Sequence, residues 1–85
     1  MWSVTIAAAA MAVLEKLDKP VAARIFKYLQ QLSQLDDPKQ RGKALVAKWA
    51  GYWRYRVGDY RVICRFETNE LVIEVIGIGH RSDVY

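Results

Sequence analysis

Residues 49–66 carry the clearest pattern in the sequence, two runs of alternating side chains on either side of Gly58-Asp59. A period of two is typical of β-strands, because successive side chains point to opposite faces of a sheet. A short Gly-containing pair between two such runs indicates a tight turn. The sequence therefore predicts a β-hairpin with strands over about Trp49–Val57 and Tyr60–Phe66, and the rest of the chain has to pack around it.

Four further elements are expected: a strand over Trp2–Ile6, helices over Ala7–Leu17 and about 19–35, and a last strand over Leu71–Ile78. Asp18 is a good N-cap for the second helix, and Pro20 fits its first turn, where a missing N–H costs nothing. Residues 39–43 read as a polar linker, and Ala44–Ala47 as a short apolar segment leading into the sheet.

The predicted order is β-α-α-β-β-β, which indicates an α+β fold. An N-terminal strand and a three-stranded antiparallel meander form one sheet, and a helical hairpin covers one of its faces. The other face is left free for function. A chain of 85 residues has room for one modest core, so we expect a single domain over residues 1–85.

Composition limits where the chain works. Cys64 is the only cysteine, which leaves no disulfide partner and favours a reducing cytoplasm. The uncharged N-terminal run lacks a Lys or Arg before Lys16, so it does not read as a signal peptide, and it is too short to span a bilayer. We therefore expect a cytoplasmic protein with no membrane partner.

The net charge of +4 is concentrated in the second half of the chain, because residues 1–38 sum to zero. Residues 39–61 hold seven cations and one anion; the cations are Lys39, Arg41, Lys43, Lys48, Arg54, Arg56 and Arg61. Segregated positive charge attracts polyanions such as nucleic acid. The alternative is a solvated basic surface that only keeps the protein soluble.

Alternation predicts which side chains of the hairpin share a face. Tyr52, Arg54 and Arg56 lie on one side of the first strand, with Trp53, Tyr55 and Val57 on the other. In the second strand Tyr60, Val62, Cys64 and Phe66 suit the core, while Arg61, Ile63 and Arg65 face outward. The outward sets would cluster four arginines, whose planar donors match phosphate oxygens, beside an aromatic ring that can stack on a base. Pairing with Glu67, Glu70 or Glu74 would neutralise only one or two of them.

The tail His80–Tyr85 is the second candidate segment, since it places the only histidine next to Arg81 and close to Tyr85. Histidine is a common proton donor or acceptor at neutral pH, although at a strand end it is more often merely solvated. One histidine and one cysteine without a carboxylate cluster fall short of a metal site. No phosphate-binding glycine loop or nucleophile motif is present, so no cofactor is expected.

These segments resemble the RelE/ParE superfamily of bacterial toxin–antitoxin toxins, in particular its RelE-like branch. The likeness rests on the run Gly51–Arg61 and the ending Gly79–Tyr85, supported by Leu17–Pro20 and by the stretch from Asp37-Pro38 to Gly42-Lys43. It covers essentially the whole chain in the same element order. The resemblance implies a RelE-like microbial ribonuclease fold, a cognate antitoxin as partner, and no small-molecule cofactor.

The resemblance also implies an activity. RelE-type toxins enter the ribosomal A site and cleave mRNA without a metal, by attack of a 2′-hydroxyl on the adjacent phosphate. By position, the catalytic set here would include Arg54, Arg61, Arg81 and Tyr85. His80 is added because it stands beside Arg81, and His80 or Tyr85 would be the general acid. The RNA-binding set would be Tyr52, Arg56, Arg65, Lys43 and Lys48. Tyr52 stands where the best-studied member has a lysine.

Two other functions fit the same superfamily. A ParE-type toxin inhibits DNA gyrase by protein–protein contact and has no nuclease site. A catalytically weak relative would survive as an antitoxin-binding module. The conjunction of Arg61, Arg81 and Tyr85 favours the nuclease, because an inhibitor needs no cluster that reads phosphates.

Overall fold

The computed structural model describes residues 1–82; Tyr85, one of the expected site residues, lies outside them. Its elements in chain order are β1 (Ser3–Ile6), α1 (Ala8–Lys16), α2 (Lys19–Ser33), η1 (Pro38–Arg41), β2 (Lys43–Ala44), η2 (Ala47–Trp49), β3 (Tyr52–Val57), β4 (Tyr60–Glu67) and β5 (Val72–His80). The α+β class and the hairpin of β3 and β4 are therefore confirmed.

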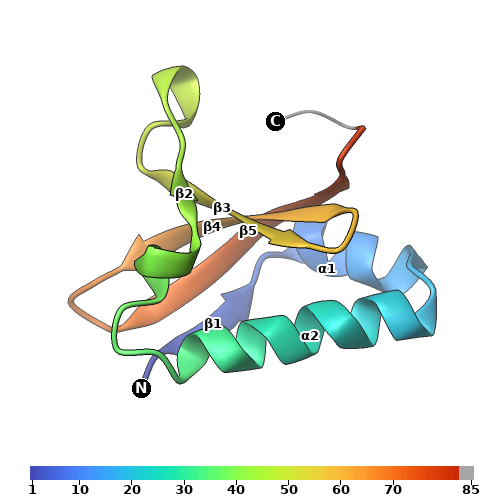
Figure 1. Ribbon diagram of the computed structural model, residues 1–85, viewed down its shortest axis with the longest axis horizontal. Coiled ribbons are helices and arrows are strands. Elements are labelled where there is room, and N and C mark those ends of the chain that lie inside the picture. The colour runs from blue at the N-terminus through green and yellow to red at the C-terminus, as the bar shows by residue number, and fades with distance from the viewer. Residues whose placement is uncertain (83–85) are drawn as a thin grey trace.

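The five strands form one sheet in the order β1-β5-β4-β3-β2, with α1 and α2 on one of its faces (Figure 1). Strand β1 runs parallel to β5, while β2, β3, β4 and β5 are joined by antiparallel pairing. Among residues 1–82, no helix is long and apolar enough to cross a membrane.

The core lies between the helices and the covered face of the sheet. Amphipathic α2 buries Ile25, Leu29 and Leu32 on one stripe, and α1 adds Ala10 and Leu14. The sheet supplies Tyr55, Val57, Val62, Cys64, Ile73, Val75 and Ile78. Burial raises the pKa of the Cys64 thiol to about 12, so this cysteine is an inert core residue, as its place in the alternation predicts.

Strand β2 is the element that the sequence did not predict. Its two residues, Lys43 and Ala44, pair with Arg54 and Trp53 of β3 and extend the sheet beyond the meander. Strand β3 also begins at Tyr52 rather than Trp49, because residues 47–49 form a 3-10 turn at the tip of a loop that projects from the sheet (Figure 1). Two residues carry no periodicity, so alternation cannot reveal a strand this short.

The segment before β2 is fixed by one buried contact. The hydroxyl of Tyr55 donates a 2.7 Å hydrogen bond to the carbonyl oxygen of Pro38. Gly42 lies against the same ring, and a Cβ atom there would meet the ring carbon Cζ at 2.8 Å. The ring therefore packs only because residue 42 has no side chain. Asp18 is the N-cap residue of α2, as predicted, although its side chain makes no capping hydrogen bond.

A bulge in β5 changes which of its residues face the helices. Ile63 of β4 pairs with Gly77, but the next residue, Cys64, pairs with Val75, so Ile76 is an extra residue. Val75 and Ile78 are consequently both in the core, although they are an odd number of positions apart. Beyond the bulge, Gly77 and Gly79 lie on the open face of the sheet.

Candidate nucleic-acid interface

Strand register gathers three arginines on the open face of the sheet. Arg56 and Arg61 are direct cross-strand partners, and Arg54 is paired with Ile63, the neighbour of Arg61 on the same face. The predicted coincidence of the two outward sets is therefore confirmed. Ile63 is an exception in burial, since the sequence expected it to face solvent and its exposed fraction is 0%.

The neighbouring strand adds no side chain beside this cluster. Gly79 is the partner of Arg61 on β5, and Gly77 is the partner of Ile63. The bulge at Ile76 brings both glycines to the open face. Arg61 is thus flanked by an arginine on one side and by bare backbone on the other, which lets a ligand approach its guanidinium along the sheet.

Burial and mutual repulsion both act on the arginines of the cluster. The pKa of the Arg54 guanidinium is lowered from its ordinary value, first by burial and then by the charges of Arg61 and Arg56. Arginine remains protonated at neutral pH even so. The three cations therefore stay charged at close range, an arrangement that is relieved when a polyanion binds.

A hollow of about 280 Å³ opens at the hairpin end of the cluster, and we call it the turn hollow. Its lining residues are Arg56, Gly58, Asp59, Tyr60, Arg61 and Arg81. The Nε atom of Arg61 is buried and has no hydrogen-bond partner among residues 1–82. Buried donors are nearly always satisfied, by protein, by ordered water or by a ligand, so this N–H is open to pairing with a ligand atom in the hollow.

Arg81 reaches the turn hollow from the segment after β5. Its main-chain N–H donates to the carbonyl oxygen of Asp59 at 2.8 Å, and its Nε lies 4.0 Å from Oδ1 of the same residue. The structure thus brings together Arg56, Arg61 and Arg81 from separate parts of the sequence. Within the described part of the chain Asp59 is the single acid in the lining, and the sequence analysis treated it only as a turn residue.

His80 lies on the opposite face of the sheet from the arginines. It is paired with Tyr60, which packs against the core, and the two rings meet edge to face with centroids 5.3 Å apart. The main-chain N–H of Ser82 donates to its Nδ1 at 3.3 Å, and the Ser82 hydroxyl is 2.9 Å from the same atom. The bulge explains this placement, because one extra residue in β5 reverses the facing of all residues after it.

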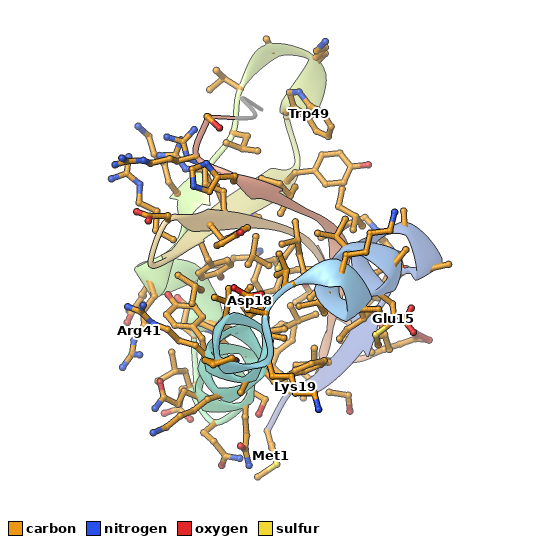
Figure 2. All side chains as sticks on the ribbon, turned by 90° about the vertical axis from the view of Figure 1, so that its right-hand side faces the viewer. Met1, Glu15, Asp18, Lys19, Arg41 and Trp49 are labelled. Atoms are coloured by element: carbon orange, nitrogen blue, oxygen red, sulfur yellow. The ribbon has the colours of Figure 1, made fainter. Side chains whose placement is uncertain are left out.

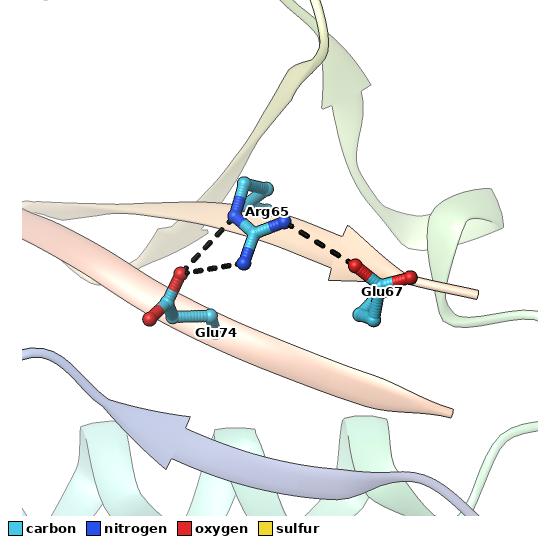
Figure 3. A network of polar contacts seen from close by, with 3 residues as sticks. All are labelled: Arg65, Glu67 and Glu74. Atoms are coloured by element: carbon cyan, nitrogen blue, oxygen red, sulfur yellow. Dashed lines mark hydrogen bonds and ion pairs between the residues drawn. The ribbon is translucent and has the colours of Figure 1, made fainter. Parts of the chain in front are cut away.

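Arg65 is neutralised by its neighbours. It contacts Glu74 through Nη2 at 3.1 Å and Nε at 3.1 Å, and Glu67 through Nη1 at 3.7 Å, as Figure 3 shows. The hydrogen bond to Glu74 is the main reason that the pKa of Arg65 is raised. Cross-strand pairing, the alternative considered for the whole set, therefore applies to this arginine and leaves the turn hollow untouched.

The remaining predicted contacts are spread along the face. Lys43 lies beside the cluster, since it pairs with Arg54 on β3. Tyr52 is next to Arg65 and packs edge to face against Trp49 at 5.7 Å, away from the turn hollow. Lys48 is in η2 at the tip of the projecting loop, where Figure 2 labels its neighbour Trp49. Neither Tyr52 nor Lys48 lines the turn hollow, so the structure does not bring these two residues to Arg56, Arg61 and Arg81.

Two further hollows adjoin Arg56 and contain cations that were left out of the predicted site. One, the helix hollow, has a volume of about 260 Å³ and is lined by Arg24, Lys27, Tyr28, Gln31, Arg56, Val57 and Gly58. The other, the strand-edge hollow, has about 240 Å³ and is lined by Tyr28, Arg41, Gly42, Lys43, Arg54 and Arg56. The spacing of Arg24 and Lys27, three apart on one helix face, was the available signal.

No cluster of potential metal ligands is found in the described part of the chain. Among residues 1–82, no group of three or more His, Cys, Asp or Glu side chains is arranged to hold an ion. What the face offers instead is a set of guanidinium groups around a solvent-open hollow. Such an arrangement is suited to binding phosphate groups and to stabilising additional negative charge on them.

Comparisons with known proteins agree with this geometry. The sequence profile of the family described as "ParE toxin of type II toxin-antitoxin system, parDE" matches residues 4–85. Toxin RelG of Mycobacterium tuberculosis (strain ATCC 25618 / H37Rv) is 29% identical over 73 residues, which are 85% of this chain and 82% of RelG.

Solved structures extend the likeness to the whole fold. The toxin–antitoxin complex RelBE2 from M. tuberculosis contains a chain with a TM-score of 0.85 and 26% identity, and the match covers 94% of this protein and 98% of that chain. The archaeal RelE–RelB complex from Pyrococcus horikoshii OT3 contains one with a TM-score of 0.76 at 23% identity, with 98% of each chain covered. The protein is therefore a member of the RelE/ParE superfamily, the toxins of type II toxin–antitoxin systems.

Proposed function

We propose that this toxin is a ribosome-dependent endoribonuclease that cleaves mRNA in the A site without a metal. The observation that carries the proposal is the turn hollow, where Arg61 keeps a buried, unpaired Nε next to Arg56 and Arg81. A protein that acts only by contact with another protein has no need for three guanidinium groups converging on one open cavity. Phosphodiester cleavage needs such a cluster.

The reaction is an internal transesterification. The 2′-oxygen of the ribose forms a bond to the adjacent phosphorus while the bond from phosphorus to the 5′-oxygen breaks, leaving a cyclic phosphate and a 5′-hydroxyl end. Charge accumulates on the phosphorane oxygens, and fixed guanidinium donors stabilise it without reorganising. Arg61 supplies a preorganised donor, Arg81 closes the hollow from the tail, and Arg54 and Arg56 hold the neighbouring backbone.

Proton transfer requires a base for the 2′-hydroxyl and an acid for the leaving 5′-oxygen. His80 and Tyr85 are the candidates in this chain. The imidazole accepts from the main chain at Nδ1, so its neutral form carries the proton at Nε2. Its place on the far face of the sheet makes it the weaker of the two. We assign the leaving-group proton to Tyr85, and the proton of the attacking 2′-hydroxyl passes to solvent water in the open hollow.

The partner that restrains the toxin is an antitoxin, as in the toxin–antitoxin complexes RelBE2, RelE–RelB and RelBE that share the fold. An antitoxin that offers acidic side chains to the open face would pair with the arginines and exclude RNA. With the ribosome and mRNA as targets, the working compartment is the cytoplasm.

Inhibition of DNA gyrase is the second candidate. It is favoured by the matching profile, whose description names the ParE toxin. Under that alternative the arginines would be a contact surface for protein, and their loss would leave mRNA unaffected. A catalytically weak, antitoxin-binding relative would affect neither target.

The deciding experiment maps mRNA ends on translating ribosomes in the presence of the purified protein. Codon-positioned cuts with 5′-hydroxyl ends support the nuclease, and intact mRNA with blocked supercoiling by gyrase supports the alternative. Arg81→Ala and Tyr85→Phe test the assigned roles in the same assay. Either variant cleaving ribosome-bound mRNA at the full rate would remove that residue from the mechanism.

A further inference from the structure

The three hollows described above form one continuous surface, because Arg56 lines all of them. The turn hollow lies on the open face of the sheet. The strand-edge hollow lies along β3 near its pairing with β2, and the helix hollow lies between β3 and α2. The surface therefore extends from the open face of the sheet, past β3, to the side chains of α2.

The charge of this surface is almost entirely positive. Eight cations line it, namely Arg24, Lys27, Arg41, Lys43, Arg54, Arg56, Arg61 and Arg81. Among residues 1–82, Asp59 is the one acid in the three linings, and Arg81 contacts it. In Figure 2, Arg41 points to solvent on one side of the molecule and Glu15 lies on the other. A field of one sign along a path favours an extended polyanion over a single small anion.

The cations of the helix hollow, Arg24 and Lys27, are accessible to a ligand. The Arg24 guanidinium lies across the β3–β4 turn, with Nη1 2.9 Å from the place of a Cβ on Gly58. Gly58 has a φ of +60°, so the turn itself favours glycine, and the absent side chain leaves room for Arg24. Among residues 1–82, no acid forms an ion pair with Arg24 or Lys27, and both side chains are exposed.

Exposed cations without acidic neighbours are the usual partners of phosphate groups along a nucleic-acid backbone. Tyr28 lies between the helix hollow and the strand-edge hollow, and lines both. An aromatic ring between two cationic sites matches the alternation of base and phosphate in a single strand. For a folded acidic protein we would instead expect a flatter surface, on which cations pair with acidic side chains at scattered positions.

We propose that Arg24 and Lys27 of α2 form a second RNA-binding site, which holds backbone phosphates outside the turn hollow. The inference rests on the proposed function in taking RNA as the ligand of the open face. The phosphates come from the strand that occupies the turn hollow or from ribosomal RNA beside it. The shared chemistry is a phosphodiester backbone, and the site reads no base sequence.

The test measures how binding depends on salt. The double variant Arg24→Gln/Lys27→Gln is compared with Lys16→Gln/Lys19→Gln, which loses the same charge at the turn between α1 and α2, where Figure 2 labels Lys19. The probes are fluorescent 2′-O-methyl RNAs, which cannot be cleaved, one a trinucleotide and one of about 12 nucleotides. Affinity is recorded by anisotropy over a range of salt concentrations.

Each phosphate contact with a single strand contributes about 0.7 to the slope of log affinity against log salt, so the α2 double variant should lose about 1.4. We expect this loss with the long RNA, no loss with the trinucleotide, and no loss in the control. If the long RNA shows no change but pelleting with ribosomes is weakened only in the α2 variant, the backbone is ribosomal. The second site would be overturned if the two double variants show equal salt slopes and equal ribosome binding. It would also be overturned if the unmodified protein binds neither RNA nor ribosomes.

Cleavage of ribosome-bound mRNA, measured in parallel, separates this inference from the proposed activity. A toxin that binds the long RNA through α2 but never cuts mRNA keeps the second site and removes the nuclease. If the unmodified toxin cuts mRNA, and the α2 double variant cuts it as fast and binds RNA and ribosomes as tightly as the control variant, the nuclease stands and the second site is removed.

Discussion

The main-chain N–H of Arg81 donates a 2.8 Å hydrogen bond to the carbonyl oxygen of Asp59, and the side chains of the two residues approach to 4.0 Å. The bond joins the segment after β5 to the turn between β3 and β4. It fixes the position from which the Arg81 guanidinium reaches the turn hollow. The ion pair, in contrast, is exposed on both sides and adds little to folding.

Replacement of Asp59 by Asn should strengthen RNA binding. The substitution keeps the main-chain bond but removes the carboxylate that the described residues contribute to the lining of the turn hollow. An unfavourable charge about 4 Å from a bound phosphate costs about 1 kcal/mol in water, so affinity for single-stranded RNA should rise about fivefold at low salt. Anisotropy titration measures the change. Glu70→Gln, on the exposed turn before β5, is the matched control and should leave affinity as it was.

Arg61→Gln and Arg65→Gln should behave differently although they remove the same charge from the same face of β4. Loss of one preorganised donor to the phosphorane lowers the cleavage rate by about 100-fold or more, which is the expectation for Arg61. Arg65 is already paired with Glu74 and Glu67, so its loss should change the rate by less than about threefold. Rates of mRNA cleavage on programmed ribosomes decide the matter, and equal losses in the two variants would contradict it.

His80→Gln should retain most of the cleavage activity. The imidazole packs against Tyr60 on the face opposite the arginines, and it does not line the turn hollow. We expect a rate within about fivefold of the unmodified toxin, since an essential general acid would contribute about 100-fold or more. The pH–rate profile provides an independent check. A profile that loses a limb near neutrality in the variant would return His80 to the mechanism.

Tyr55→Phe should destabilise the fold by about 1–2 kcal/mol, because the carbonyl oxygen of Pro38 loses a buried donor. Urea unfolding followed by tryptophan fluorescence measures the difference. Tyr52→Phe is the control, since no hydrogen bond from its hydroxyl is formed among residues 1–82. A control that costs as much as the Tyr55 variant would argue against the buried bond as the cause.

The same variant has a pH signature. Burial raises the pKa of the Tyr55 phenol above its ordinary value, so the folded state resists losing this proton. Its contribution is fully present below about pH 10 and is lost as the pH rises further, because the unfolded chain then ionises first. The stability difference between the unmodified protein and Tyr55→Phe should therefore shrink by about 1 kcal/mol between about pH 8 and about pH 11. A constant difference would rule out this linkage.

Alternation alone predicted the central part of the site. It placed Arg54, Arg56 and Arg61 on one face, and the register confirms it, because a period of two survives in any regular antiparallel pair. It would not have placed His80, because the extra residue Ile76 in β5 reverses the facing of the residues after it. A bulge depends on how two strands fit together, so a single strand's pattern does not reveal it.

Tertiary packing decided the remaining differences. Alternation places Ile63 on the outward face of β4, and the register agrees, yet its side chain is completely buried. Arg24 and Lys27 read as the solvated face of a helix, and only the approach of α2 to the β3–β4 turn brings them to Arg56. Each of these features comes from two segments meeting, which no local pattern encodes.

The parallel pairing of β1 with β5 has a consequence for synthesis. Ser3 is registered with Val72, so β1 has to wait until the much later β5 has been made before the two strands can pair. Loops of this length are slow to form, and the pairing cannot begin while β5 is still being made. The segment that follows β5 carries Arg81, so the turn hollow is completed only after β5 has been made. That order leaves an interval during synthesis in which a partner can be present before the hollow is complete.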